Sequence, residues 1–429
     1  MTSRHPSVLA AGSLAIILLL MISMTLVPIA RAQPSVSATV TVGKAPYGIA
    51  YDPARGEIFA VSYDADTVSL ISDNSNEVVA TIDVGHSPAD IAYDSAKGEM
   101  FVSNTVSDTV SVISDSSDSV VATVNVGTDP RGIAYDPSQG VVYVCTSTSS
   151  TSGTVYVISD SSNAVVGMIS LPGAATGIAY DSGKGELFVS TGVTSVSVVS
   201  TSTGDIVATV TVPGLPRGIT YDPDNGDLYV SNYDTSANSV SVISDSSNAV
   251  VATVPVGPWP FYSTYDSALN EVFVGDSDSH MVSVISASNN TVVDTLTAGE
   301  YPTAAAYDSA MGEVFVTNFG INTVSVISGA GASTTTSTSS ATTFPPSTTT
   351  ITTSSNMTVL SSSTGTTTPT TSTSSSAIQT TSTTMSATTT ASTGSVPEFP
   401  PSIMLASAVA IVVVTAYYLT SHRSLPSRS

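Results

Sequence analysis

The chain has 429 residues, of which 33 are acidic and 10 are basic, and its net charge is -23 at pH 7. This balance excludes nucleic acid and anionic lipid as partners, because phosphate groups are bound by clustered Lys and Arg. It favours solubility and loosely bound divalent cations. Cys145 is the single cysteine, so no intramolecular disulfide can form, and we expect a buried spare thiol.

Residues 1–32 have the order of a secretory signal peptide. Arg4 and His5 precede the apolar run 8–27, and Ala-Arg-Ala at 30–32 supplies a small-residue cleavage site. The mature chain then begins near Gln33. An uncleaved anchor helix is the alternative.

The body of the chain, 33–330, repeats the dipeptide Tyr-Asp seven times. The intervals between successive copies are 42, 42, 45, 41, 44 and 42 residues, with tyrosines at Tyr51, Tyr93, Tyr135, Tyr180, Tyr221, Tyr265 and Tyr307. A period in the low forties that contains only strand and turn signals is the size of a four-stranded propeller blade. The predicted fold is an all-β, seven-bladed β-propeller.

The second unit shows the predicted blade. Strands are expected at 90–93, 99–104, 109–114 and 120–126, where β-branched and aromatic residues are enriched. The turns between them begin with an Asp, which accepts backbone hydrogen bonds, and several contain a Gly. No run with helical periodicity interrupts the strands.

The two ends of the body complement each other. The seventh unit stops without its fourth strand, and a spare copy of that strand lies at 37–42. Pairing the two completes seven four-stranded blades and leaves no strand edge exposed. We therefore expect the N-terminal strand to close the ring.

These units resemble the YVTN β-propeller repeats of archaeal and bacterial surface-layer proteins. The motif appears as Phe101-Val-Ser-Asn104, Tyr229-Val-Ser-Asn232 and Phe315-Val-Thr-Asn318, and the resemblance covers about 37–328. The other four units carry a different residue at the Asn position, namely Tyr63, Thr146, Thr191 and Asp276. The resemblance implies extracellular scaffolding or binding and no single activity.

The C-terminal hundred residues predict a stalk and an anchor. Residues 331–396 are rich in Ser and Thr, which indicates a disordered, O-glycosylated stalk. In 397–429, a Pro-Glu-Phe-Pro motif resembling archaeal C-terminal sorting signals precedes the apolar run 403–419, long enough for a transmembrane helix, and a basic tail. Removal of this helix and retention as a plain span are both open. Asn289 and Asn356 are candidate N-glycosylation sites.

One face of the predicted ring carries aromatic and basic residues in the loops that lead into each inner strand. Exposed aromatic side chains with a few polar partners suit cell-envelope glycan or protein partners. The candidate ligand-binding residues are Tyr47, His86, Arg131, Arg217, Trp259, Tyr262 and Tyr301. The loops between second and third strands add Tyr63, Tyr233, His280 and Phe319 to the same face. Packing of Trp259 against the channel rim is the purely structural alternative.

The sequence contains no catalytic or metal-binding motif, and no cofactor is expected. Each Asp of the Tyr-Asp repeat begins a turn on the opposite face, so its recurrence has a structural cause. Asp73, Asp115, Asp160 and Asp245 open the turns between third and fourth strands in the same way. The favoured function is a non-catalytic cell-surface binding or surface-layer protein. The alternative is an extracellular propeller enzyme, lactonase-, lyase- or quinoprotein-like, with its site at the channel mouth.

Overall fold

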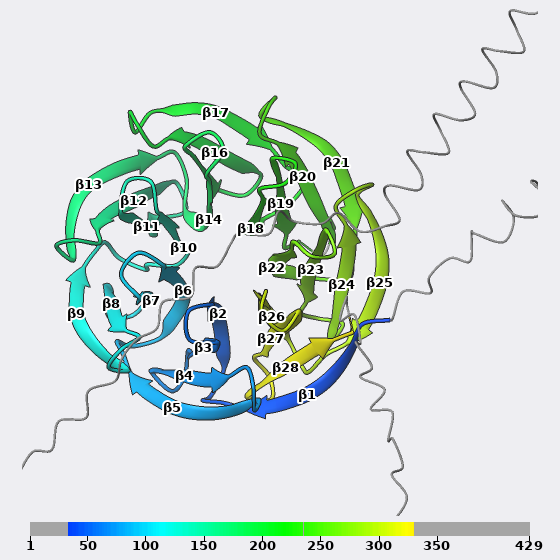
Figure 1. Cartoon of the computed structure of the whole chain (residues 1–429). Coiled ribbons are helices and arrows are strands. Elements are labelled where there is room, and N and C mark those ends of the chain that lie inside the picture. The colour runs from blue at the N-terminus through cyan, green and yellow to red at the C-terminus, as the bar shows by residue number, and fades with distance from the viewer. Residues whose placement is uncertain (1–32, 235, 330–429) are drawn as a thin grey trace, which may run out of the picture. The chain divides into compact units, whose positions relative to one another are not determined.

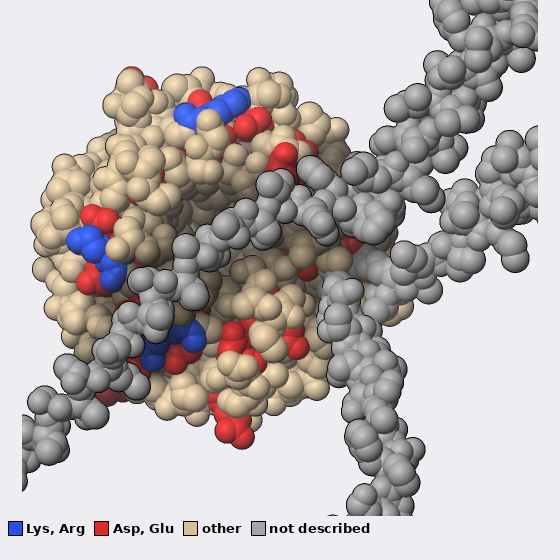
Figure 2. Space-filling view, viewed as in Figure 1, with Lys and Arg blue, Asp and Glu red and all other residues tan. Residues whose placement is uncertain are grey.

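The structure is a computed structural model that describes residues 33–234 and 236–329. These residues form seven four-stranded antiparallel sheets arranged in a ring (Figure 1), and the ring is hollowed at its centre by a channel (Figure 2). The expected seven-bladed β-propeller is therefore confirmed. The predicted signal peptide, stalk and C-terminal segment lie outside the described residues.

In each blade the first strand lines the channel and the fourth lies at the rim (Figure 1). Blades 1 to 3 comprise β2 (Pro46–Asp52), β3 (Glu57–Ser62), β4 (Thr67–Ser72) and β5 (Glu77–Asp83); β6 (Pro88–Asp94), β7 (Glu99–Asn104), β8 (Thr109–Ser114) and β9 (Ser119–Asn125); and β10 (Ile133–Asp136), β11 (Val141–Ser149), β12 (Ser152–Ser159) and β13 (Ala164–Leu171). Blades 4 and 5 comprise β14 (Ala175–Asp181), β15 (Glu186–Thr191), β16 (Ser195–Ser200) and β17 (Ile206–Thr211); and β18 (Pro216–Asp222), β19 (Asp227–Asn232), β20 (Ser239–Ser244) and β21 (Ala249–Pro255). Blades 6 and 7 comprise β22 (Pro260–Asp266), β23 (Glu271–Asp276), β24 (Met281–Ser286) and β25 (Thr291–Thr297); and β26 (Pro302–Asp308), β27 (Glu313–Asn318), β28 (Thr323–Ser328) and β1 (Ser35–Thr41).

The ring is closed by the N-terminal strand, as expected. β1 pairs antiparallel with β28, with Thr41 opposite Thr323 and Ser35 opposite Ser328. The last blade therefore joins both ends of the described chain, and its outer strand is supplied from outside the seventh repeat.

The core lies between the blades. The two middle strands of a blade are apolar on both faces because neighbouring sheets cover both; Phe101 in β7 and Val112 in β8, for example, are fully buried. Each hydrophobic cluster spans two adjacent blades, such as the one that joins Phe59 of blade 1 to Met100 of blade 2. In the outer strands, exposed residues instead alternate with partly buried or buried ones.

The strand register corrects one detail of the repeat alignment. Tyr63 is the residue expected at the Asn position of the first unit, but Ser62 pairs with Pro46 there, as Asn104 pairs with Pro88 in blade 2. Tyr63 instead begins the following loop, one residue beyond the expected position.

The ring has two chemically different faces. We call one the loop face, because it carries the connections between blades and between second and third strands. His86 and Asp66, from two such loops, are in contact, with Nδ1 2.7 Å from Oδ2. The opposite side, the turn face, carries the tight turns after first and third strands; there the Asp73 N–H donates to the Gly56 carbonyl.

The repeated Asp residues stabilise the turns of the turn face. Oδ1 of Asp52 accepts the N–H of Ala54 at 2.8 Å. The equivalent bond is present in all six of the remaining blades. These aspartates are essentially fully buried. Their structural role is therefore visible in the hydrogen bonds, and they lie far from the loop-face candidates in the fold, at the other end of each inner strand.

Candidate binding site at the channel mouth

The loop-face mouth of the channel is lined by two successive positions at the start of each inner strand, which in blade 3 directly precede β10. The first position carries Tyr47, Ala89, Arg131, Thr176, Arg217, Phe261 and Thr303 in blades 1 to 7. The second carries Gly48, Asp90, Gly132, Gly177, Gly218, Tyr262 and Ala304. Glycine dominates the second position because the inner strands converge: a Cβ at Gly177 would overlap the Arg217 carbonyl oxygen. Asp90 and Tyr262 are the two large exceptions.

One half of the mouth is aromatic. Phe261 packs edge-on against Tyr47 and Tyr233, with ring centroids 5.4 and 5.2 Å apart, and Tyr233 also lies 5.6 Å from Trp259. These rings border a cavity of about 360 Å³ whose lining also includes Ser277, Tyr301, Thr303, Phe319 and Gly320. Such a cluster offers flat apolar surface for stacking.

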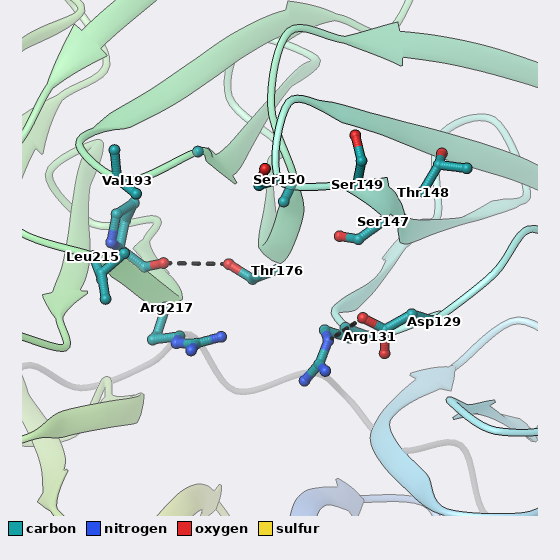
Figure 3. Close-up of a pocket in the computed structure, with 13 residues that line it drawn as sticks. Asp129, Arg131, Ser147, Thr148, Ser149, Ser150, Thr176, Val193, Leu215 and Arg217 are labelled. Carbon is teal, nitrogen blue, oxygen red and sulfur yellow. Dashed lines mark hydrogen bonds and ion pairs between the residues drawn. The ribbon is translucent and has the colours of Figure 1, made fainter.

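The other half is basic and polar. A second cavity of about 400 Å³ is lined by Arg131 and Arg217 together with the Ser/Thr-rich segment 147–150 at the end of β11 (Figure 3). The guanidinium groups of the two arginines are directed toward the same open space (Figure 3). Arg131 is paired with a carboxylate, since its Nε lies 2.9 Å from Asp129 Oδ2.

Arg217 joins the two halves. Its guanidinium carbon lies 5.2 Å from the centroid of the Tyr233 ring and 6.0 Å from that of Phe261. Nε of Arg217 is buried and has no hydrogen-bond partner among the described residues. Cation–π contact orients the group without neutralising its charge. Arg217 is therefore an ordered cation in the mouth that has no ion pair among the described residues.

Asp90 places a carboxyl group in the same channel. It accepts the N–H of Ile91 at 2.9 Å and that of Ile133 at 3.2 Å, but burial still raises its pKa to about 7. Burial and then the charge of Asp90 raise the pKa of Tyr262, while Arg217 and Arg131 act in the opposite direction. Burial likewise raises the pKa of Tyr47 to about 12. These groups form one electrostatic network.

The structure gathers most of the predicted site residues and leaves one out. Tyr47, Trp259 and Tyr301 line the aromatic cavity, Arg131 lines the basic cavity, and Arg217 adjoins both. Tyr262 packs against Phe261 at 5.2 Å. His86 lines neither cavity: it is exposed and paired with Asp66.

Asp90, Thr176 and Ser277 are not among the site residues predicted from the sequence. The sequence did contain a signal for Asp90, because this residue stands at the second mouth position, where glycine is the most frequent residue. Thr176 and Ser277 are common residue types in this sequence and gave no such signal. Asn289, a candidate glycosylation site, is exposed between β24 and β25, while Asn356 lies outside the described residues. Cys145 is buried as expected.

Residues 33–234 and 236–329 contain no group of three or more His, Cys, Asp or Glu side chains arranged to hold a metal ion. Within the same residues no helix has the length and apolarity needed to cross a bilayer. The predicted transmembrane run at 403–419 is not among them.

Comparison with known proteins identifies the fold and does not identify a family or a function. No family model matches the chain, and no curated protein matches its sequence. Among solved structures it is similar to Kuenenia stuttgartiensis hydrazine synthase, with a TM-score of 0.59 and 17% identity over 66% of this chain and 95% of that one. The likeness is one of fold. This chain shares the β-propeller architecture. At such identity, function has to be argued from the site itself.

Proposed function

We propose that this β-propeller is a non-catalytic cell-surface protein that binds an acidic glycan of the cell envelope at its channel mouth. The observation that carries the proposal is Arg217, whose guanidinium has no ion pair among the described residues and stacks on Tyr233 and Phe261 between an aromatic and a basic cavity.

The two cavities match the two parts of an acidic sugar. Aromatic faces stack on the apolar faces of pyranose rings, and a guanidinium group binds a carboxylate through two parallel hydrogen bonds. Both cavities are concave and hold a few hundred Å³, which suits one or two sugar units. A protein partner with a flat interface makes less use of such hollows.

The surface location is supported by the sequence. The signal-peptide pattern at 1–32, the Ser/Thr-rich segment 331–396 and the apolar run in 397–429 favour an extracellular propeller carried on a stalk and anchored by a C-terminal transmembrane segment. The resemblance of the units to YVTN repeats favours a surface-layer setting. A role with nucleic acid is disfavoured by the net charge of -23.

Asp90 supports a second candidate, an extracellular lyase. A carboxyl group with a pKa of about 7 can act as an acid or a base at neutral pH, and it lies in the channel near Tyr262. Two arginines nearby could neutralise a uronate carboxylate. This candidate requires that the bound sugar be cleaved.

Trp259 provides the test, because it is the only Trp of the chain and it lines the aromatic cavity. The full chain is titrated with a uronate oligosaccharide and with a neutral one of equal length, while Trp fluorescence is recorded. We expect saturable quenching by the uronate. Arg217→Gln should weaken its affinity by roughly 10- to 100-fold, the value of a charge-assisted hydrogen bond.

Arg55→Gln, on the turn face, is the matched control and should bind like the unmodified chain. Equal affinity of Arg217→Gln for the uronate, or tighter binding of the neutral sugar, would reject the acidic-glycan proposal. Formation of an unsaturated sugar, detected by its ultraviolet absorbance, would replace the non-catalytic proposal with the lyase.

A further inference from the structure

Neighbouring blades meet on the turn face in a repeated arrangement. The Asp after the inner strand of one blade lies close to the residue that opens the outer turn of the next blade. In four of the seven junctions that second residue is also an Asp. The four pairs are Asp308 with Asp73, Asp52 with Asp115, Asp94 with Asp160, and Asp181 with Asp245.

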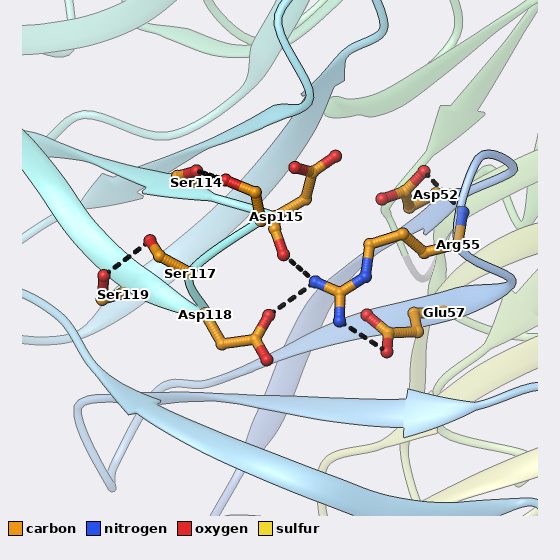
Figure 4. Close-up of polar contacts among 9 residues, drawn as sticks. Asp52, Arg55, Glu57, Ser114, Asp115, Ser117, Asp118 and Ser119 are labelled. Atoms are coloured by element: carbon orange, nitrogen blue, oxygen red, sulfur yellow. Dashed lines mark hydrogen bonds and ion pairs between the residues drawn. The ribbon is translucent and has the colours of Figure 1, made fainter. Parts of the chain in front are cut away.

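Three of these four acidic junctions contain a basic side chain. Arg55 donates from Nη2 to Glu57 Oε1 at 3.0 Å and from Nη1 to Asp118 Oδ1 at 2.6 Å, and Nη1 also contacts the Asp115 carbonyl oxygen (Figure 4). Lys184 lies at the equivalent position, with Nζ 3.8 Å from Asp245 Oδ1.

The third basic side chain is Lys97, which lies beside Glu99 in the junction of Asp94 and Asp160. In the three junctions without an Asp pair the equivalent residues are uncharged, namely Gln139, Asn225 and Leu269. Basic residues therefore occur on this face only where two aspartates meet, as expected if they compensate buried like charges.

The junction of blades 7 and 1 departs from this rule. Asp308 is fully buried and Asp73 is 5% exposed, but the position of Arg55 is taken by Met311, which is 46% exposed. The remaining basic residues of the described chain, Lys44, Arg131 and Arg217, belong to the loop face. Figure 2 shows three separate groups of basic atoms on the turn face, each next to acidic atoms, and none between the blades of β2–β5 and β26–β28.

One buried carboxylate oxygen at this junction is left without a hydrogen-bond partner. Asp73 Oδ1 is buried and unpaired among the described residues, whereas the Tyr51 hydroxyl is hydrogen-bonded to the Asp308 carboxylate. Burial and then the nearby Asp308 carboxylate raise the pKa of Tyr51, so the hydroxyl lies beside this carboxylate. Among the four aspartates at its position, Asp73 alone has such an oxygen. Two carboxylates and a phenol are fewer ligands than a complete protein cage, so water must supply the rest, as it does in many calcium sites.

We propose that the junction of blades 7 and 1 binds a hard divalent cation of the calcium class between Asp73 and Asp308, with the Tyr51 hydroxyl beside it. The cation takes the place that Arg55, Lys97 and Lys184 hold in the other acidic junctions. It links the last blade to the first, so its binding stabilises the closed ring. This site is independent of the glycan site on the opposite face.

The test compares thermal unfolding of the full chain in calcium and in EDTA. At a calcium concentration about a hundred times the Kd, the midpoint of the unmodified chain should rise by about 5 °C. Met311→Lys supplies the missing ammonium group, so its midpoint in EDTA should be raised and its response to calcium lost. Leu269→Lys, at the same position of a junction without an Asp pair, should keep the full response.

Asp73→Asn removes a charged ligand with little change of shape. It tests the site independently if the longer side chain of Met311→Lys does not fit. It should abolish the calcium response. Tb³⁺ luminescence excited through tyrosine should appear with the unmodified chain, be displaced by calcium, and be lost in Asp73→Asn. An unmodified chain with no calcium-dependent midpoint, or an Asp73→Asn variant that retains the full response, would overturn the proposal.

Discussion

At the buried Asn position of the repeat, the residue type decides which hydrogen bonds can form. Asn318 donates from Nδ2 to Thr323 and Ser325 at 3.0 and 2.9 Å and accepts the Gly299 N–H at 2.9 Å. In blade 6 this place is held by Asp276, which accepts from Ser283 at 2.6 Å. A fully buried carboxylate lacks the donor that an amide supplies, and burial raises its pKa to about 7.

Asp276→Asn should therefore stabilise the protein at neutral pH. A carboxyl group whose folded-state pKa is raised stabilises the fold most at low pH, and that contribution is lost as the pH rises from about 4 through 7. We expect the variant to gain about 1 to 2 kcal/mol at pH 7 and to depend less on pH in this window. Urea unfolding between pH 4 and pH 8 measures both effects.

The residual pH dependence of the variant should come from Asp90, whose pKa is also about 7. Asp278→Asn, an exposed change in the same blade, is the control and should leave the free energy of unfolding unchanged. A loss of stability in Asp276→Asn at pH 7 would show that the amide cannot adopt the hydrogen bonds that Asn318 makes.

For single residues, the sequence indicated most of the side chains that the structure brings together at the channel mouth. Aromatic and basic residues in the inter-blade loops were recognisable because they differ from the Gly, Pro and Ser around them. Asp90 was not selected, because an Asp in an Asp-rich repeat looks ordinary until glycine is seen to be the rule at its position. The stacking of Arg217 on Tyr233 joins an inner-strand residue to a residue of the loop after β19, which spacing alone does not reveal.

Among the secondary-structure elements, β1 has the least local support. It is separated from its partner β28 by nearly the whole body of the chain, so its pairing closes a very long loop. Its side chains nevertheless match an ordinary outer strand. Val40 is 5% exposed and packs in a cluster with Ile58 and Val324.

Val40→Ala should cost about 1 to 3 kcal/mol in the free energy of unfolding, because it leaves a cavity in the core between blades 7 and 1. Val124, also 5% exposed, holds the same position in β9, and Val124→Ala should cost a similar amount. Val121→Ala changes a side chain that is 51% exposed and should be nearly neutral. Denaturant unfolding of the three variants gives the comparison. If Val40→Ala behaved like Val121→Ala, β1 would not be an integral part of the last blade.

The elements were predictable because periodicity, turn chemistry and strand composition agree in all seven units. Predicted strands at 99–104 and 109–114 coincide with β7 and β8. The one alignment error, Tyr63 for Ser62, arose where no Asn marked the strand end. Register there is fixed by pairing with Pro46, a contact that the sequence alone does not show.

For the whole molecule, the distribution of charge is more informative than its sum. The described propeller has six Lys and Arg residues, three on each face. On the turn face they lie in acidic junctions, whereas Arg131 and Arg217 lie together at the channel mouth. An acidic ligand is therefore attracted at short range by a molecule whose overall field repels it.

This contrast predicts an unusual salt dependence for the proposed glycan binding. Salt screens charges over distances beyond about 8 to 10 Å, so it weakens the long-range repulsion more than the contact with Arg217. The association rate of a uronate oligosaccharide should therefore rise between low and physiological ionic strength, as followed by stopped-flow fluorescence of Trp259. A neutral oligosaccharide should show no such change. Arg217→Gln should increase the dissociation rate and leave the salt effect on association in place. Association that slows with added salt would mean that the arginines, and not the net charge, control the approach of the ligand.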